Sequence, residues 1–381
     1  MKVTKQDYIL KLSHCKLIIG NGFDLHCGLK SSYSDFFDEN KKEYLSMLEF
    51  LKSVWFVGNF SSLLDQSNSY YDDFKSKVEV YDMFNIWDCF FALSFENRLD
   101  KSLWCNIEYE MKKSFVQRDQ SYPNRSFWEE VFELVTEGYG SIKFTQKSFL
   151  CAAFINARTK KSTFKTIDLF YKYLLKELND FEVRFGKFIA KQIDDKYKSK
   201  ANAFIRKIGA QVYSIDSFNY TSFLYNGCID FKNINGNLEK IEKGISNMIF
   251  GIDSTKISPE APEYIFTKSF RRLSLQSSDN FIIENYHFKN IIIFGHSLNE
   301  QDYNYYFPIF EQMKLSDLTE NSTIVILYKV YDEIKREEIV EELWKSVSKM
   351  LYAYDSFKNI NNGNRLMEML SSNNRLILRE I

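Results

Sequence analysis

Four short polar stretches carry the residues of this sequence whose types and spacing fit a binding or catalytic site. They are Gly20–Asp24, Ser217–Thr221, Asn233–Asn237 and Gly295–Asn299. Each closes a run rich in β-branched and aromatic residues, so each is predicted to lie at the carboxyl end of a strand. In an open parallel sheet, ligands bind where those strand ends meet loops. The pattern therefore predicts one shared site at one sheet edge.

The first stretch is typical of a turn whose backbone approaches a phosphate. Its free N–H groups, and the positive end of the following helix, favour an anion. It is not a full dinucleotide fingerprint, because Leu25 stands where a third glycine is needed and no acidic residue closes a following strand. Asp24 suits a ribose hydroxyl or a water better than a phosphate, since a carboxylate accepts hydrogen bonds. Cofactor contacts are expected from Gly20, Asn21, Gly22 and Phe23.

Each polar stretch also has an ordinary structural explanation. Gly-Asn-Gly forms tight turns, Asn219 and Asn235 suit helix caps, and His296 suits a packed core position. Taken singly, these explanations are preferred, but four such stretches in phase with strand ends favour a common ligand site. We therefore predict catalytic roles for Asp24, Asn219 and His296, and further cofactor contacts from Asn235, Gly236, Gly295 and Ser297.

The strands expected to position these residues alternate with helices. Strands are predicted at 17–19, 212–218, 230–235, 248–252, 290–294, 322–328 and 375–378. Helical patterns cover 302–313 and 332–351, with a short helix near 365–370. Alternation of strands and helices predicts an α/β fold with a Rossmann-like parallel sheet, covered by helices.

A long helical stretch interrupts this pattern. Residues 36–200 lack the pattern of strands closed by glycine turns that is typical of an α/β core. Helices are expected there at 125–135 and 166–193. Aromatic residues make up 17% of the chain, which predicts an aromatic helical core. The predicted domains are a discontinuous nucleotide-binding core of residues 1–35 and 201–381, and a helical insertion or cap of residues 36–200.

The composition limits the class of protein. Net charge is −1, with 50 basic and 51 acidic residues, so bulk nucleic-acid binding is not indicated, although a local basic groove stays open. The six cysteines form no C-x-x-C pair, so neither a disulfide framework nor a structural zinc site is expected. No signal-peptide pattern or bilayer-length apolar run occurs, which predicts a cytoplasmic protein without a membrane partner.

Together these residues resemble the AbiH family, the bacteriophage abortive-infection proteins. The stretches that carry the resemblance are IIGNGFDLHCGLKSSYSDF at 18–36, SFNYTSFL at 217–224, NINGNLE at 233–239 with MIFGID at 248–253, and FGHSLNEQDYNYYF at 294–307. The family is distantly similar to sirtuin-like and deoxyhypusine-synthase-like NAD-binding folds. That similarity implies that Asn219 orients a ribose or an attacking water, and that Gly295, His296 and Ser297 hold NAD from the far side of the switch point.

The resemblance implies an antiphage effector that binds NAD or a related nucleotide and hydrolyses its bond to nicotinamide, as an NAD glycohydrolase does. One departure concerns Asn233 and Asn235, where related sequences place histidines, because asparagine cannot act as a general base near neutral pH. The alternatives are a non-enzymatic sensor that recognises a phage or host protein, and a nuclease with Asp24, Glu300 and Asp302 as metal ligands. A homo-oligomer is expected in each case.

Overall fold

The computed structural model describes most of the chain. The described residues are 10, 12–57, 60–95, 107–117, 125–138, 144–160, 163–223, 230–254, 257–276, 288–317, 319–358 and 365–381. They form two compact units, the first from residues 1–31, 189–238 and 276–381, and the second from residues 32–188 and 239–275. Compared with the predicted boundaries, the first unit also includes residues 189–200, and the second also includes residues 32–35 and 239–275.

The first unit is built on a six-stranded parallel sheet, which confirms the predicted α/β class. Its strand order is β3-β2-β1-β6-β7-β8. The strands are β1 Cys15–Ile19, β2 Val212–Ser217, β3 Asp230–Asn233, β6 Asn290–Phe294, β7 Thr323–Tyr328 and β8 Leu376–Glu380. This is the doubly wound order of dinucleotide-binding sheets once the two short strands β4 and β5 are set aside.

The prediction of a sheet strand at 248–252 is wrong. Only Asn247–Met248 is a strand there, β5, and like β4 (Gly236–Asn237) it lies outside the six-stranded sheet. The Phe250 N–H donates to the Glu182 carboxylate at 2.8 Å, and the Ile252 N–H donates to the Phe266 carbonyl at 3.0 Å. The apolar segment is therefore bonded to a helix side chain and a neighbouring loop, which a strand pattern does not reveal.

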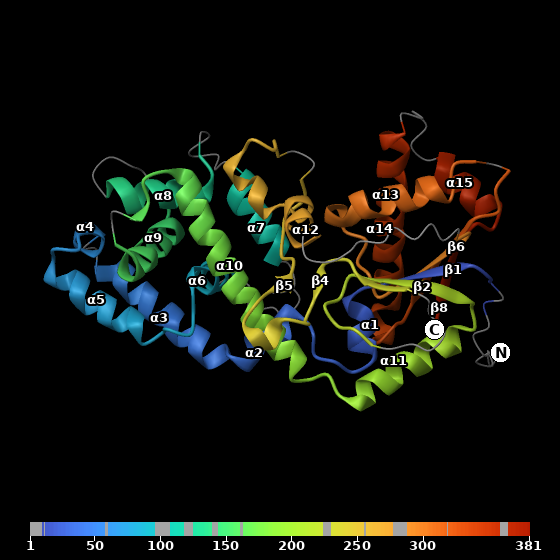
Figure 1. Ribbon diagram of the computed structural model, residues 1–381, viewed down its shortest axis with the longest axis horizontal. Coiled ribbons are helices and arrows are strands. Elements are labelled where there is room, and N and C mark those ends of the chain that lie inside the picture. The colour runs from blue at the N-terminus through green and yellow to red at the C-terminus, as the bar shows by residue number, and fades with distance from the viewer. Residues whose placement is uncertain are drawn as a thin grey trace. The chain divides into compact units, whose positions relative to one another are not determined.

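Helices cover both faces of the sheet (Figure 1). Helices α13 (Tyr303–Gln312), α14 (Arg336–Phe357) and α15 (Arg365–Ser372) share one apolar core with inward-facing strand residues such as Ile18, Ile293 and Ile326. Helices α1 (Asn21–His26) and α11 (Asp195–Ile208) cover the alternate strand residues on the other face. There Phe23 and Phe204 pack against Phe294, with Phe204 and Phe294 stacked at 4.6 Å between ring centroids.

The second unit is helical, which confirms the helical stretch predicted between β1 and β2. Its helices are α2 Tyr33–Glu39, α3 Lys41–Val57, α4 Phe60–Leu64, α5 Ser69–Glu79, α6 Ile86–Phe95, α7 Ile107–Val116, α8 Phe127–Glu137, α9 Gln146–Arg158, α10 Ile167–Ala190 and α12 Lys268–Gln276. Its core is aromatic, with Trp87, Trp128, Phe91 and Phe266 fully buried. No helix in the described parts of the chain is long and apolar enough to cross a membrane.

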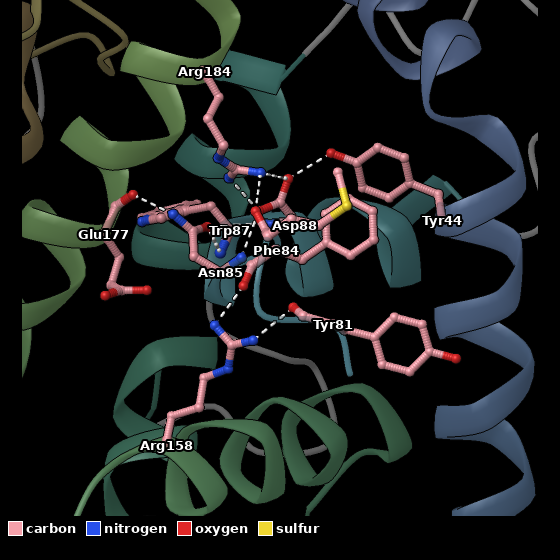
Figure 2. A network of polar contacts seen from close by, with 10 residues as sticks. Tyr44, Tyr81, Phe84, Asn85, Trp87, Asp88, Arg158, Glu177 and Arg184 are labelled. Carbon is pink, nitrogen blue, oxygen red and sulfur yellow. Dashed lines mark hydrogen bonds and ion pairs between the residues drawn. The ribbon is translucent and has the colours of Figure 1, made fainter. Parts of the chain in front are cut away.

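A buried polar network fixes the start of α6 in this unit (Figure 2). Asp88 is fully buried and accepts hydrogen bonds from the guanidinium of Arg184 on α10 and from the hydroxyl of Tyr44 on α3. Its second oxygen also accepts the Asn85 N–H at 2.6 Å. Arg158 donates to the Tyr81 carbonyl at 2.7 Å, and so holds the turn that precedes α6. One carboxylate thus joins three helices.

Candidate functional site

The four polar stretches lie at the carboxyl ends of four neighbouring strands. They follow β1, β2, β3 and β6, which occupy consecutive positions β3-β2-β1-β6 in the sheet and run parallel. The chain leaves β1 towards β2 on one side and later returns to β6 on the other side, so the switch point of the sheet lies between β1 and β6. All the predicted site residues therefore belong to one edge of one sheet.

The glycines at the switch point interlock. A Cβ built on Gly20 would lie 2.6 Å from the Gly295 carbonyl oxygen and from the His296 Cα, and a Cβ on Gly22 would lie 2.7 Å from the Gly295 Cα. Conversely, a Cβ on Gly295 would lie 2.3 Å from the Phe23 nitrogen. Distances below 3 Å are too short for a side-chain carbon, so glycine is required at all three positions to let the two turns touch.

The expectation that the first turn offers free N–H groups is wrong for three of its residues. Gly20 donates to the Phe294 carbonyl at 3.1 Å, Gly22 donates to the Gly295 carbonyl at 2.8 Å, and Phe23 donates to the Gly20 carbonyl at 2.8 Å. The Gly20 and Gly22 amides join the β1 turn to the end of β6 and its turn, and the Phe23 amide closes the β1 turn on itself. The same glycine pattern that predicts an anion cradle therefore serves here to pack two turns together.

Asp24 and Asn219 form a buried polar network behind the first turn. The Asp24 carboxylate is fully buried and accepts hydrogen bonds from the Tyr197 hydroxyl at 2.7 Å and the Thr221 hydroxyl at 2.9 Å. The Asn219 side-chain amide donates to the Gly20 carbonyl at 3.0 Å. Two of the predicted catalytic residues thus lie together, and both bond to the protein so that the β1 turn, the β2 loop and α11 are held in register.

Burial raises the pKa of Asp24 to about 6, because a low-polarity surrounding disfavours the charged carboxylate. The hydroxyls of Tyr197 and Thr221 and the amide of Asn219 offset part of this rise, because they stabilise the charged form. Perturbed pKa values cluster at functional sites, and buried structural networks also produce them.

This pKa gives a testable dependence of stability on pH. The folded state binds the Asp24 proton more tightly than the unfolded state, so the associated stability is present below about pH 4 and is lost as pH rises through 6. Relative to Asp24→Asn, which is neutral throughout, we expect the wild type to lose about 2 kcal/mol of unfolding free energy between pH 4 and 7. Denaturant titrations of both proteins across this range measure the difference, and a constant difference would contradict the assignment.

The third predicted catalytic residue, His296, is engaged through both ring nitrogens. Its Nδ1 accepts the Leu298 N–H at 3.0 Å, so the proton of the neutral ring belongs on Nε2, which faces an Asp302 carboxylate oxygen at 3.4 Å. The ring also packs on Phe218, with centroids 4.2 Å apart. This geometry makes His296 an anchor for the β6 loop, whereas a general base needs an unprotonated nitrogen facing the substrate.

The β3 and β6 loops present the remaining predicted residues. Asn235 is buried, and its amide lies 3.4 Å from the Phe218 carbonyl, while Gly236 follows in the left-handed region at φ +84°. Ser297 is exposed at the switch point. Leu298 next to it is buried with φ +54°, a strained conformation for a residue with a side chain.

Two residues of the network were not among the predicted site residues. Tyr197 lies on the buried face of α11, where it has the appearance of an ordinary core residue, and 173 positions separate it from Asp24. Thr221 lies within the second polar stretch, but nothing in its neighbours indicates that its hydroxyl meets Asp24. The contact between Tyr197 and Asp24 depends on the tertiary fold, so the residues around Tyr197 in the sequence contain no signal for it. Leu224, the last residue of the segment SFNYTSFL at 217–224, lies outside the described residues.

Two basic side chains of α12 that could contact a phosphate backbone have carboxylate partners within the second unit. Arg271 is buried on α12 and forms an ion pair with Glu182 at 2.5 Å, while Lys268 pairs with Glu108 at 2.9 Å. Across the described residues, no three His, Cys, Asp or Glu side chains are grouped to hold a metal ion. Arg271 and Lys268 are therefore already paired with carboxylates of the second unit.

The fold and the site define a doubly wound α/β protein with polar loops gathered at the switch point of its sheet. The sequence profile of the AbiH family, described as bacteriophage abortive infection, matches residues 17–328. The chain therefore belongs to the AbiH family. No curated protein and no solved structure gives a significant match. The distant similarity to sirtuin-like folds is not among these findings and stays a prediction.

Proposed function

We propose that this AbiH protein binds a nucleotide, NAD in the first instance, at the carboxyl edge of its sheet and acts through that nucleotide in phage defence. The observation that carries the proposal is the placement of four polar loops on four adjacent parallel strands around the β1/β6 switch point. Doubly wound sheets bind their ligands at this place.

The residues at this edge divide into two groups by burial. Asp24, Asn219 and His296 are almost wholly enclosed and bond to the protein, so they act as positioning residues. The side chains of Asn21, at the start of α1, and of Ser297, in the β6 loop, are exposed on either side of the switch point. Amide and hydroxyl groups of this kind can hydrogen-bond ribose hydroxyls and phosphate oxygens. We therefore assign direct contact with the nucleotide to the exposed group.

A charge added to the first turn tests this assignment. Asn21→Asp has the same shape and keeps the oxygen that accepts the Ser31 hydroxyl at 2.5 Å, but it adds a negative charge. We expect it to weaken NAD binding about tenfold or more, since a like charge near the phosphates costs about 1.4 kcal/mol or more. Isothermal titration calorimetry measures the affinity.

Gln211→Glu is the matched control. Gln211 is exposed and lies just before β2, at the opposite edge of the sheet, so the same added charge there is expected to leave NAD affinity unchanged. Equal affinities of the wild type and Asn21→Asp, or equal losses in both variants, would contradict a site at the β1 turn. Absence of any NAD binding by the wild type would contradict the proposal itself.

Hydrolysis of the bound nucleotide is a second candidate, and the observation that favours it is the near-neutral pKa of Asp24 beside Asn219 at the switch point. The departing nicotinamide leaves without a proton, so electrostatic stabilisation can supply much of the catalysis. Chromatography of the titrated samples separates the candidates. Intact NAD after prolonged incubation supports a binding module, and released nicotinamide supports an NAD glycohydrolase.

A further inference from the structure

Helix α11 carries an unusual charge for a chain that is close to neutral overall. Its 14 residues include five basic side chains and one acidic side chain. Lys196, Lys200 and Lys207 are spaced by four and seven residues, which places them on one stripe of the helix. All three are exposed. The stripe spans about 16 Å along the helix axis at 1.5 Å per residue.

This stripe borders the end of α1. Phe204, on the adjoining face of α11, packs edge-on against the His26 ring with centroids 5.0 Å apart. A Cβ built on Gly28 would lie 2.9 Å from the Lys200 ammonium nitrogen. The lysine stripe and the residues that follow α1 therefore form a continuous surface, all within the first unit.

The segment after β7 completes the surface with an exposed aromatic ring. Tyr331 is 66% exposed, and its hydroxyl lies 3.1 Å from the His26 Nδ1. The Lys329 ammonium lies 5.0 Å from the centroid of the Tyr331 ring. One tyrosine thus stands among cationic side chains from two separate parts of the fold.

Several of these cations lie close enough to His26 to lower its pKa. The pKa of His26 is lowered first by burial and then by the positive charges of Lys329, Lys207 and Lys200. Three lysines from α11 and from the segment after β7 therefore act on one imidazole, although they are far apart in sequence. At neutral pH the ring is driven towards its uncharged form, and the lysines supply the positive potential.

We propose that the surface formed by the lysine stripe of α11, His26 and Lys329–Tyr331, here called the lysine surface, binds single-stranded nucleic acid. The lysines match a phosphate backbone, which carries one negative charge per nucleotide. The exposed face of Tyr331 offers a platform on which a base can stack, and stacking beside a basic groove is the usual basis of sequence-independent recognition of single strands. A purely acidic peptide would use the lysines but leave the ring without a role.

The experiment measures fluorescence anisotropy of labelled 20-nucleotide single-stranded DNA and RNA of mixed sequence, titrated with the full chain at several salt concentrations. We expect binding of both, with log K falling against log salt with a slope of about −3, as four phosphate contacts predict. The double variant Lys200→Glu/Lys329→Glu is expected to weaken binding at least tenfold and to flatten the slope. The control Lys349→Glu makes the same change at an exposed position on α14 and should have little effect.

Tyr331 distinguishes a nucleic-acid surface from a general polyanion surface. Tyr331→Phe keeps the ring and should retain oligonucleotide binding, whereas Tyr331→Ala should weaken it about fivefold or more, because stacking contributes about 1 to 3 kcal/mol per base. Neither change should alter the binding of poly-glutamate. Equal responses of oligonucleotide and poly-glutamate to Tyr331→Ala would assign the surface to an acidic protein and overturn the proposal.

Two further outcomes are decisive. Failure of the wild type to bind either oligonucleotide at low salt would overturn the proposal, as would an equal loss of binding in the Lys349→Glu control. The proposal does not depend on the nucleotide site, because the Lys200→Glu/Lys329→Glu variant should bind NAD as the wild type does if NAD binds at the switch point. Competition between NAD and the oligonucleotide would show that the lysine surface is not a separate site.

Discussion

Gly295→Ala should unfold at a temperature lower by about 6 °C or more, because a methyl group at this position costs about 3 kcal/mol or more. The added carbon would stand 2.3 Å from the Phe23 nitrogen and 2.6 Å from the Gly22 carbonyl carbon, which are backbone atoms that cannot rotate away. Gly295 also has φ +69°, a conformation that side chains disfavour. Either the β1 turn or the β6 turn must move.

Gly244→Ala separates the two causes. Gly244 has φ +72°, but a Cβ there would meet nothing within 4 Å. It should therefore suffer only the backbone penalty of about 1 kcal/mol. Circular dichroism during heating gives both midpoints. Similar losses in the two variants would mean that the interlock at the switch point contributes little to stability.

The strongest sequence patterns predicted their elements closely. The run of isoleucines at 290–294 is β6 with the same bounds, and the long apolar stripe at 166–193 is α10, Ile167–Ala190. The helix predicted at 125–135 is α8, Phe127–Glu137, which begins with a capping box between Ser126 and Glu129. In each case one local pattern was enough to specify the element, because its apolar residues lie either on both faces of a strand or along one stripe of a helix.

The candidate site was less predictable, because the same residues serve structure and ligand binding equally well. Gly20 and Gly22 fit an anion cradle by sequence, yet their close neighbours are Gly295 and His296, more than 270 positions away. The partner of Asp24, Tyr197, lies on a helix with an ordinary amphipathic pattern. Local signals name the residues that lie at strand ends, but only tertiary contacts reveal which of them are already satisfied by the protein.

The polar residues of the first unit therefore fall into two groups, buried ones that hold the turns and exposed ones that a ligand can reach. Buried side chains join the turns that follow β1 and β2, and a backbone hydrogen bond joins the turns that follow β1 and β6. These contacts fix the edge of the sheet where a ligand can bind. Loss of such a group is expected to disturb stability and binding together. The exposed Asn21 and the lysine surface can be changed with little effect on the fold, and they are therefore the better positions for testing function.

The second large effect is expected from Asp88→Ala in the second unit, which should lower the free energy of unfolding by about 3 to 5 kcal/mol. Asp88 is fully buried, and its removal leaves the Arg184 guanidinium without its carboxylate, the Tyr44 hydroxyl without its acceptor and the Asn85 N–H uncapped (Figure 2). Trp87 and Trp128 are buried in the same core, so tryptophan fluorescence during denaturant unfolding reports the loss.

Asp73→Ala is the matched control, because it also removes an ion-paired aspartate from the second unit. Asp73 pairs with Lys77 at 2.7 Å, but both side chains are more than half exposed, so the loss should stay below about 1 kcal/mol. The double variant Asp88→Ala/Arg184→Ala should lose less than the sum of its two single variants, since it removes both the buried charge and the charge left without a partner. Additive losses would mean that Asp88 and Arg184 act on the fold independently, and that the carboxylate stabilises α6 mainly through Tyr44 and the Asn85 amide.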